Sequence, residues 1–377
     1  MRIGILTLPL NTNYGGILQA WALQTVLERM GHEVKVIHKN PYLKEPSLWE
    51  YLCRYYKKKV LGKQLFVKAE KWHNQVTPIL RKNIEMFIAK HIHSYTIDTL
   101  QQIEENDFDV IVVGSDQIWR KKYFIESWGN DEANAFLEFA EKWKIKRIAY
   151  AASFGTDEWE FSERYSSDIS RLIKKFNAVS VREKSGVEIC KKYLNVEALH
   201  LLDPTMLFNS KDYQELLKDS DLPSQSNSLF CYILDDSKEK QDIINRIAAT
   251  KKLTPRQMFF PTEYADATQC KPFPPVEQFI QGIMNANFVI TDSFHGSVFS
   301  IIFNKPFVAI NNSSRGSTRL SSLLTMFGLE KKLIETSTML TQDIINLSVD
   351  YKEVDELLDE LRKSSFTFLE TYLENTQ

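Results

Sequence analysis

The polar turn at residues 291–297, TDSFHGS, holds the groups of this chain that are best placed for chemistry. An apolar run precedes it at residues 288–290, and a second apolar run follows at helical spacing in residues 298–302. The pattern predicts a strand, a tight turn and a helix, with Asp292 and His295 beside exposed N–H groups at the positive end of the helix dipole. Such turns bind anionic ligands in α/β proteins. The alternative is an ordinary connection in which the aspartate caps the helix and the histidine is structural.

Polar loops also follow predicted strands earlier in the chain, as a ligand-binding cleft requires. Residues 11–16 open a helix with two glycines, which would let a ligand approach the backbone or would simply form a tight turn. This loop matches neither the dinucleotide-binding nor the P-loop pattern. Asp116, directly after residues 110–115, could bind sugar hydroxyls, act as a general base or cap a helix. The residues of these loops that we expect to bind substrate are Asn13, Tyr14, Gly15, Gly16, Ser115 and Ser153.

Three arginines in strand-end loops provide cationic groups for an anionic ligand. Arg182 follows one predicted strand, and Arg315 and Arg319 follow the last one. A guanidinium group binds a carboxylate or phosphate through two parallel hydrogen bonds, whereas lysine acts as a point charge. The alternative for Arg182 is an ion pair with Glu183, which their adjacency on a strand disfavours. Together with His295, these arginines predict an anionic ligand between two lobes.

The elements that must position these groups are short strands alternating with amphipathic helices, the sequence pattern of βαβ units and parallel sheets. Apolar residues at helical spacing, followed by Gly31, predict the first helix at residues 17–30. The predicted strands are residues 3–8, 34–38, 110–113, 147–151, 178–181, 201–202, 229–234, 257–260, 288–291 and 307–310.

The length predicts two domains, because 377 residues exceed what one ordinary core accommodates. The polar stretch 209–227 separates the earlier predicted strands from the later ones, and we expect the domain boundary there. The expected units are an N-terminal α/β lobe, 1–215, and a C-terminal α/β lobe, 216–350, which carries the TDSFHGS turn. A helical pattern follows in 351–377 and could pack across the two lobes.

Residues 49–93 interrupt this alternation with a basic, aromatic stretch. Lysines and arginines outnumber the acidic residues Glu50, Glu70 and Glu85, and aromatic side chains are interleaved with them. Such an amphipathic insert is typical of a peripheral contact with a membrane surface. The alternative, which charge runs more often indicate, is a solvated helical hairpin that covers one edge of a sheet.

The composition excludes several classes of protein. With a formal net charge of −2, the whole molecule lacks the positive charge typical of nucleic-acid-binding proteins. No sequence window has the apolar length that a membrane span needs. The four cysteines lack metal-ligand spacing and indicate reduced thiols in a cytosolic protein. His91 and His93 have no carboxylate partner at useful spacing, so we expect no metal site. We therefore expect a cytoplasmic protein, or one that is at most peripheral at the inner face of the membrane.

Six motifs taken together resemble the polysaccharide pyruvyl transferase family. In chain order they are NYGGILQAWALQ, VVGSDQIW, YAASFG, SVREKSG, LLDPTML and VITDSFHGSVFSIIFNKPFVAI, and they span roughly residues 1–330. The resemblance implies an α/β fold of two Rossmann-like lobes facing a cleft, a glycosyltransferase-B-like arrangement. It also implies transfer of a pyruvyl group from phosphoenolpyruvate, as co-substrate and without a further cofactor, to a galactose-like hexose. The product would be a pyruvate ketal on a bacterial surface polysaccharide, such as a capsule or exopolysaccharide, or on its lipid-linked precursor.

The same resemblance assigns roles to residues of this chain. The family's arginine after the middle strand falls on Arg182, as a ligand for the carboxylate or phosphate of phosphoenolpyruvate. Its late histidine falls on His295, as a phosphate contact or a proton donor. Asp116 or Asp292 would take the proton of the sugar hydroxyl, and the sequence does not choose between them.

Ser293 departs from the family pattern. The better-studied members have Arg-Leu-His where this chain has Ser293-Phe294-His295, so an arginine that would hold the enolpyruvate is absent. Arg315 or Arg319 of the next loop could supply the missing charge. The turn residues that we expect to bind substrate are Ser293, Gly296 and Ser297.

Two other functions fit the sequence. A nucleotide-sugar glycosyltransferase of the same overall fold would bind a nucleoside diphosphate in its C-terminal lobe. A catalytically silent glycan-binding protein is suggested by the absent arginine. The pyruvyl transferase is favoured because the polar groups cluster at strand ends.

Overall fold

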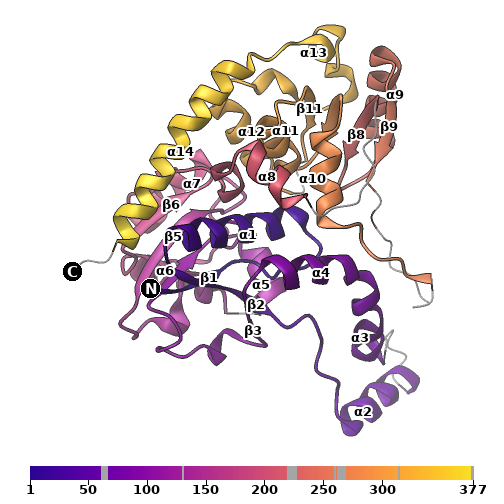
Figure 1. Cartoon of the computed structure of the whole chain (residues 1–377). Coiled ribbons are helices and arrows are strands. Elements are labelled where there is room, and N and C mark those ends of the chain that lie inside the picture. The colour runs from indigo at the N-terminus through magenta and orange to yellow at the C-terminus, as the bar shows by residue number, and fades with distance from the viewer. Residues whose placement is uncertain are drawn as a thin grey trace.

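Two parallel sheets form the body of the molecule (Figure 1). The computed structural model describes residues 1–60, 67–129, 131–218, 227–258, 260, 269–312 and 315–374. The first sheet has the strand order β3-β2-β1-β4-β5-β6-β7 and the second the order β12-β11-β10-β8-β9. The first is the Rossmann order with one added strand, and the second is the flavodoxin-like order. The predicted α/β class with two Rossmann-like units is therefore confirmed.

The elements have the following bounds. The strands of the first sheet are β1 Arg2–Leu6, β2 Glu33–Lys39, β3 Ser94–Ile97, β4 Val110–Val113, β5 Lys146–Ala152, β6 Ala178–Val181 and β7 Leu199–His200. Those of the second are β8 Ser228–Tyr232, β9 Thr254–Gln257, β10 Phe288–Thr291, β11 Phe307–Ile310 and β12 Leu333–Ile334. The helices are α1 Tyr14–Arg29, α2 Leu48–Lys59, α3 Ala69–Leu80, α4 Lys82–His91, α5 Lys121–Trp128, α6 Glu163–Ile173, α7 Lys184–Ile189, α8 Ser210–Leu216, α9 Lys238–Lys251, α10 Val276–Met284, α11 Phe294–Ile302, α12 Ser317–Met326, α13 Gln342–Asn346 and α14 Tyr351–Leu373. Short helical turns lie at Leu100–Gln102, Glu132–Phe136, Glu138–Ala140, Cys190–Leu194, Pro204–Leu207, Glu330–Lys332 and Ser337–Met339.

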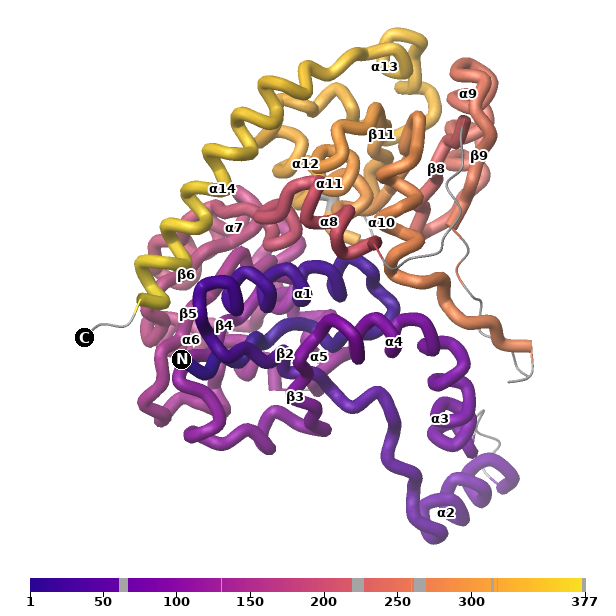
Figure 2. The backbone as a smooth tube through the Cα atoms, viewed as in Figure 1, coloured from indigo at the N-terminus to yellow at the C-terminus, as the bar shows by residue number. Residues whose placement is uncertain are grey.

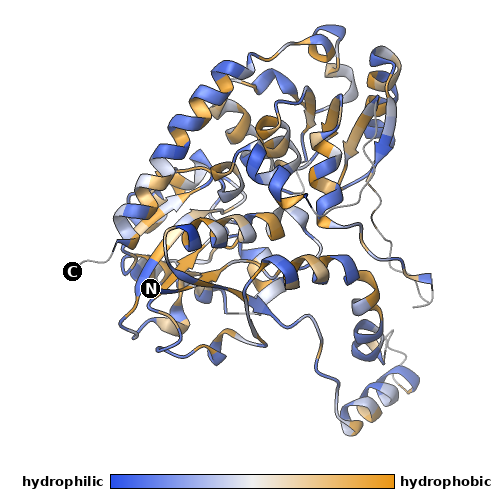
Figure 3. Cartoon of the chain, viewed as in Figure 1, coloured by the Kyte–Doolittle hydropathy of each residue, from blue (hydrophilic) through white to orange (hydrophobic). Residues whose placement is uncertain are grey.

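The central strands are buried along their whole length because helices cover both faces of each sheet. β4 (VIVV), β10 (FVIT) and β11 (FVAI) have every residue buried. Figure 3 shows hydrophobic residues, in orange, concentrated in the strands and on the helix faces that pack against them. Since β1 pairs in parallel with β4, and β10 with β11, the polar turns that follow these strands lie at the carboxyl edges of the two sheets.

Several strands at the sheet edges differ from those predicted from the sequence. β3 and β12 were not predicted, because β3 (SYTI) is polar and largely exposed and β12 has only two residues. β7 ends just before the predicted strand 201–202 begins. β9 overlaps the predicted strand 257–260 only at Gln257, and residue 259 lies outside the described residues. Edge strands carry less hydrophobic signal than central ones, so their positions are poorly determined by an apolar pattern.

The predicted first helix and linker differ in detail from the structure. α1 begins at Tyr14 rather than at residue 17, because both glycines are taken into its first turn. The polar stretch 209–227 starts with α8, which Asn209 caps by accepting from two backbone N–H groups; residues 219–226 lie outside the described residues. The division of the chain into lobes at residue 215 stays a prediction.

The C-terminal helix α14 contacts segments that belong to both sheets (Figure 1). Arg362 donates from Nε to the carbonyl of Met206 at 2.7 Å, in the segment after β7. Asn304, between α11 and β11, donates to Asp355 at 3.0 Å. The helix therefore ties the two sheets together on the side away from α2.

The basic stretch 49–93 forms an arm (Figures 1 and 2). α4 packs on the first sheet with its apolar face buried, whereas α2 lies at the far end of the arm, away from both sheets. Residues 61–66 of this stretch lie outside the described residues. Across the described part of the chain, no helix combines the length and the apolar character needed to span a bilayer.

Candidate active site

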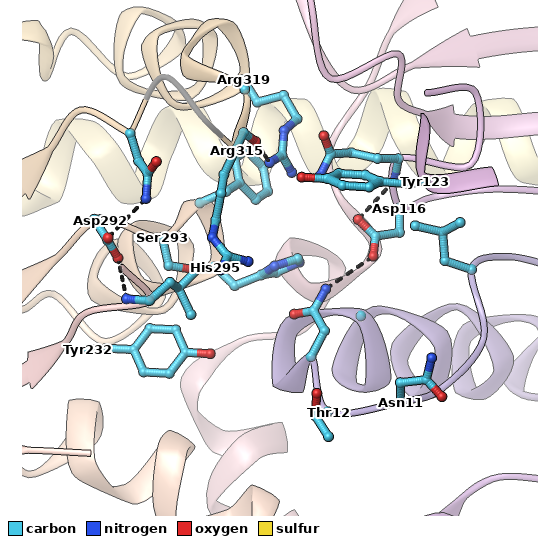
Figure 4. Close-up of a pocket in the computed structure, with 18 of the residues that line it drawn as sticks. Asn11, Thr12, Asp116, Tyr123, Tyr232, Asp292, Ser293, His295, Arg315 and Arg319 are labelled. Atoms are coloured by element: carbon cyan, nitrogen blue, oxygen red, sulfur yellow. Dashed lines mark hydrogen bonds between the residues drawn. The ribbon is translucent and has the colours of Figure 1, made fainter. Parts of the chain in front are cut away.

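A pocket with a cavity volume of about 420 Å³ lies where the carboxyl edges of the two sheets meet (Figure 4). The loops after β1 and β4 form one wall together with α5, and the loops after β10 and β11 form the other together with α12. The sequence-predicted residues that border it are Asn13, Gly16, Asp116, Asp292, Ser293, His295, Arg315 and Arg319. The strand-end turns of two distant parts of the chain thus meet in one site.

His295 lies in the first turn of α11, with Ser293 rather than Asp292 at the N-cap position. The histidine is 4% exposed, and its Nε2 lies 3.5 Å from Oδ2 of Asp203. The ring packs against Gly15 of α1, where any Cβ would overlap the imidazole. Gly15 is therefore required for close approach between α1 and α11, which explains one of the two glycines in the first loop.

Arg182 links Asp203 to Asp116 on the first wall. Its Nη1 donates to Oδ2 of Asp203 at 2.5 Å, and its Nη2 lies 3.5 Å from Oδ1 of Asp116. Burial alone would raise the pKa of Asp203, but the neighbouring His295 and then Arg182 outweigh it and hold that pKa well below its ordinary value. Arg182 does not pair with Glu183, which instead accepts from the loop after β5. The result is a buried chain of charges that runs between the two walls.

Asp116 is a carboxylate of the first wall that borders the pocket, at the end of β4. It is 3% exposed, accepts from the Nδ2 of Asn13 at 3.2 Å and from the backbone of Gln117 at 2.8 Å. It does not cap a helix, because α5 begins five residues later with Arg120 at its N-cap. Gly16 lies directly beside it, and a Cβ there would be 3.0 Å from Oδ2 of Asp116.

Asp292 on the second wall is held by donors on all sides. It accepts from the backbone of Leu234 at 2.7 Å and of Asp235 at 3.2 Å, from Nζ of Lys240 at 2.7 Å and from Nδ2 of Asn312 at 3.0 Å. These bonds connect the loops after β8, β10 and β11. Asp292 therefore organises the second wall, and its oxygens are already occupied within it.

The two arginines after β11 differ in their partners. Arg315 is half-exposed and donates twice to Asp235, at 2.6 and 2.8 Å, which keeps the pKa of that carboxyl below its ordinary value. Arg319 is 7% exposed; its Nη2 donates to the carbonyl of Arg315, and its Nε has no hydrogen-bond partner among the described residues. Burial and the nearby Arg182 lower the pKa of Arg319 to about 10, so it remains charged at neutral pH. The pocket thus contains a buried cation without a carboxylate partner in the described structure.

Several residues expected to bind substrate lie behind the pocket surface. Arg182 is separated from the cavity by Phe294, whose ring centre is 4.5 Å from its guanidinium carbon. Ser115 donates to Gln19, and Ser153 donates to Glu183. The remaining predicted residues that do not border the pocket are Tyr14, Gly15, Gly296 and Ser297. Their positions support the walls from behind.

Sequence reasoning missed several residues of the site. Asp203 had a usable signal, since it ends a predicted strand as Asp116 does, but it was not assigned a role. Lys240 of α9 carried no such signal, because it reaches Asp292 from a helix. Tyr232, at the end of β8, borders the pocket, and burial raises its pKa, so the phenol stays neutral. Tyr123 and Glu126 border it from α5.

No group of three or more potential metal ligands occurs in the part of the chain that the structure describes. His91 packs against Phe87 with ring centres 4.7 Å apart. His93 lies 2.7 Å from a carboxylate oxygen of Glu28. The two histidines therefore have separate partners.

A protein-family model described as polysaccharide pyruvyl transferase matches residues 13–314. No curated protein matches the chain. The match begins at the end of the loop after β1 and ends within the loop after β11, before Arg315 and Arg319.

The solved structures that resemble this chain have low sequence identity and low TM-scores. The UDP-GlcNAc 2-epimerase from Neisseria meningitidis bound to UDP-GlcNAc has a TM-score of 0.48 and 11% identity, covering 100% of both chains. The UDP-GlcNAc 2-epimerase from Methanocaldococcus jannaschii has a TM-score of 0.45 and 14% identity over 98% of this chain and 99% of that one. The spinosyn forosaminyltransferase SpnP has a TM-score of 0.41 and 12% identity over 100% and 96%.

Proposed function

The chain belongs to the polysaccharide pyruvyl transferase family, and on that premise we propose that it transfers the pyruvyl group of phosphoenolpyruvate to a hexose. Two hydroxyls of the sugar, which we expect to be galactose-like, would receive it as a cyclic ketal with release of phosphate. The acceptor would be a bacterial surface polysaccharide or its lipid-linked precursor.

The observation that carries this proposal is Arg319, a buried guanidinium that borders the pocket without a carboxylate partner among the described residues. A buried cation is costly unless a counter-charge binds it, and a guanidinium suits a carboxylate or phosphate. Phosphoenolpyruvate has both groups. Arg319 thereby offers the charge that Ser293 does not supply, whereas Arg315 is already engaged by Asp235.

The proposed reaction balances in protons when the one that leaves His295 is returned at the end of the cycle. His295 donates a proton to the methylene carbon of phosphoenolpyruvate, and the first sugar hydroxyl adds to the adjacent carbon as Asp116 accepts its proton. The second hydroxyl then displaces phosphate, which leaves with that hydroxyl's proton, and the proton on Asp116 restores His295 through solvent. The carboxylate of Asp203 lies 3.5 Å from His295 Nε2, where it would balance the charge of the ring when the ring carries the proton to be donated.

Asp116 is preferred to Asp292 as the base because of their partners. Asp116 borders the pocket with Asn13 and a backbone N–H as its hydrogen-bond donors. Asp292 accepts from the loops after β8 and β11 and from Lys240 of α9. Asp116 has fewer donors than Asp292, and its nearest cation, Arg182, is 3.5 Å away rather than the 2.7 Å of Lys240 from Asp292, which favours Asp116 as the group that takes up a proton.

The test is mass spectrometry of hexose and glycan acceptors after incubation with phosphoenolpyruvate, together with an assay for released phosphate. We expect one pyruvyl ketal per acceptor and one phosphate per ketal, and we expect His295→Gln to lower kcat by about 10²- to 10⁴-fold. Thermal-shift measurements with phosphoenolpyruvate, UDP and GDP run in parallel. Stabilisation by a nucleotide alone, with no ketal formed, would identify a nucleotide-sugar enzyme instead; glycan binding without phosphate release would identify a silent relative.

A further inference from the structure

Helix α2 stands out because it exposes the side chains that a helix ordinarily buries. A complete capping box between Ser47 and Glu50 fixes its start, and none of its residues is buried. Leu48 is 84% exposed, Trp49 72% and Leu52 61%. Other large side chains exposed on or next to this helix are Tyr55, Tyr56 and Val60. A soluble helix without a partner for such a face would be unusual.

The apolar side chains lie on one face of α2. Leu48, Leu52 and Tyr56 recur at intervals of four residues, and Trp49 lies one position from that row. Arg54 lies on the opposite side and donates twice to the carboxylate of Glu70 on α3, at 2.7 and 2.8 Å. The polar side of the helix therefore faces its own protein, and the apolar side faces outward.

The charges at the C-terminal end of α2 are positive. Lys57, Lys58 and Lys59 end the helix, and none has an ion-pair partner among the residues that the structure describes. The nearby acids are already used, Glu50 by the capping box and Glu70 by Arg54. Tryptophan, tyrosine and lysine on an exposed amphipathic helix are the residues that favour the surface of an anionic bilayer.

The arm that carries α2 also forms hydrogen bonds with segments that border the pocket. Arg81, between α3 and α4, donates to the carbonyl of Leu10 at 2.7 Å and to the side chain of Asn11 at 3.2 Å. Asn83 donates to the carbonyl of Phe273 at 2.7 Å. Asn11 and Phe273 both border the pocket. A surface bound by α2 would therefore lie against the arm that supports the pocket entrance.

We propose that the outward face of α2, which comprises Leu48, Trp49, Leu52 and Tyr56, docks on an anionic lipid bilayer, with the lysines 57–59 at the end of the helix contacting the lipid headgroups. A second copy of this chain fits the same face less well, because its lysines would meet lysines of equal charge. The proposal rests on the proposed function in one respect: docking would present the pocket to an acceptor carried on a lipid at the membrane surface.

The experiment is co-sedimentation of the full chain with vesicles of phosphatidylcholine alone and with vesicles containing equal amounts of phosphatidylglycerol. We expect binding only to the anionic vesicles, weakened by salt. The triple variant Lys57→Gln/Lys58→Gln/Lys59→Gln should bind roughly 100-fold less, at about fivefold per lysine. Trp49→Ser/Leu52→Ser should reduce binding to a similar extent. The matched control Lys191→Gln/Lys192→Gln/Lys211→Gln removes three exposed lysines elsewhere and should bind as the parent does.

Two further measurements separate this proposal from the proposed function. Ketal formation on a soluble sugar acceptor should be unchanged in the α2 variants, because no residue of α2 borders the pocket. Melting temperatures and light scattering establish folding and oligomeric state. Equal binding by the α2 variants and the control, or absence of binding by the parent, would overturn membrane docking. A parent dimer that the Trp49→Ser/Leu52→Ser variant converts to a monomer would assign the face to self-association instead.

Discussion

The two walls of the pocket place the same kind of residue, an aspartate after a buried central strand, in opposite chemical situations. On the first wall, Asp116 follows β4 and borders the cavity with Asn13 and one backbone N–H as its donors. On the second wall, Asp292 follows β10 and accepts from four donors, one of them the ammonium group of Lys240. We propose that the first carboxylate acts on the substrate, whereas the second holds its own wall together.

Two arginines of the second wall show the same contrast, Arg315 in the loop after β11 and Arg319 in the first turn of α12. Arg315 is engaged by Asp235, whereas Arg319, four residues later, has an Nε without a partner among the described residues. A charged residue at a strand end therefore marks a pocket wall, but its role depends on partners from elsewhere in the chain. Each prediction below tests that rule at a different residue.

The largest effect is expected from Asp116→Asn, which should lower kcat by about 10²- to 10⁴-fold because the proposed base is removed. The melting temperature should fall less than that of Asp203→Asn, because Arg182 keeps Asp203 as its closest counter-charge and the amide can still accept a hydrogen bond from Asn13. Steady-state assays of phosphate release measure this. Asp292→Asn is the paired variant: if it lowers kcat in a folded protein while Asp116→Asn does not, the roles of the two walls are reversed.

Asp203, which joins the walls through Arg182 and His295, should have the largest effect on stability. Asp203→Asn leaves a buried guanidinium without its closest counter-charge, which typically costs about 3–5 kcal/mol in free energy of unfolding. The pKa of Asp203 is depressed in the folded protein, so its contribution is present above the unfolded value of 3.8 and is lost as the pH falls through the folded value.

Urea unfolding of parent and variant between neutral and acid pH measures both effects. We expect the free-energy difference between the two proteins to shrink as the pH falls below 3.8. A difference that is independent of pH would show that the carboxylate acts through packing rather than through its charge. In that case the charges of Asp203, Arg182 and His295 would not account for the contribution of Asp203 to stability.

Asp292→Asn should destabilise the protein by about 2–3 kcal/mol, the usual range for loss of charge-assisted hydrogen bonds. The reason is that Lys240 loses its carboxylate partner while the loops after β8 and β11 lose part of their connection. Thermal and urea unfolding check this, with Asp116→Asn as the control. An unchanged stability would contradict the scaffold role, whatever the effect on catalysis.

The sequence predicted the parallel sheets, the first long helix and the positions of the polar turns, because central strands and βα turns produce strong local patterns. It could not distinguish Asp116 from Asp292, since both follow apolar runs of the same kind. The difference arises from Lys240, which approaches from α9, and from Asn312 after β11. It could not foresee that Phe294 would separate Arg182 from the cavity either. Partners that are distant in sequence carry no local signal, and they decide which charges remain available.

The smallest and most specific effect is expected at the two arginines after β11. Arg319→Gln should raise the KM for phosphoenolpyruvate roughly 10- to 100-fold, the value of one or two hydrogen bonds to a charged group, with a smaller change in kcat. Arg315→Gln should change it by less than about threefold, because a half-exposed ion pair contributes little. Binding of phosphoenolpyruvate measured by calorimetry checks both without requiring an acceptor. A larger loss of phosphoenolpyruvate binding in Arg315→Gln than in Arg319→Gln would show that an existing ion pair does not decide which arginine binds the substrate. The choice of Asp116 rather than Asp292 as the base rests on the same reasoning and would then fail too.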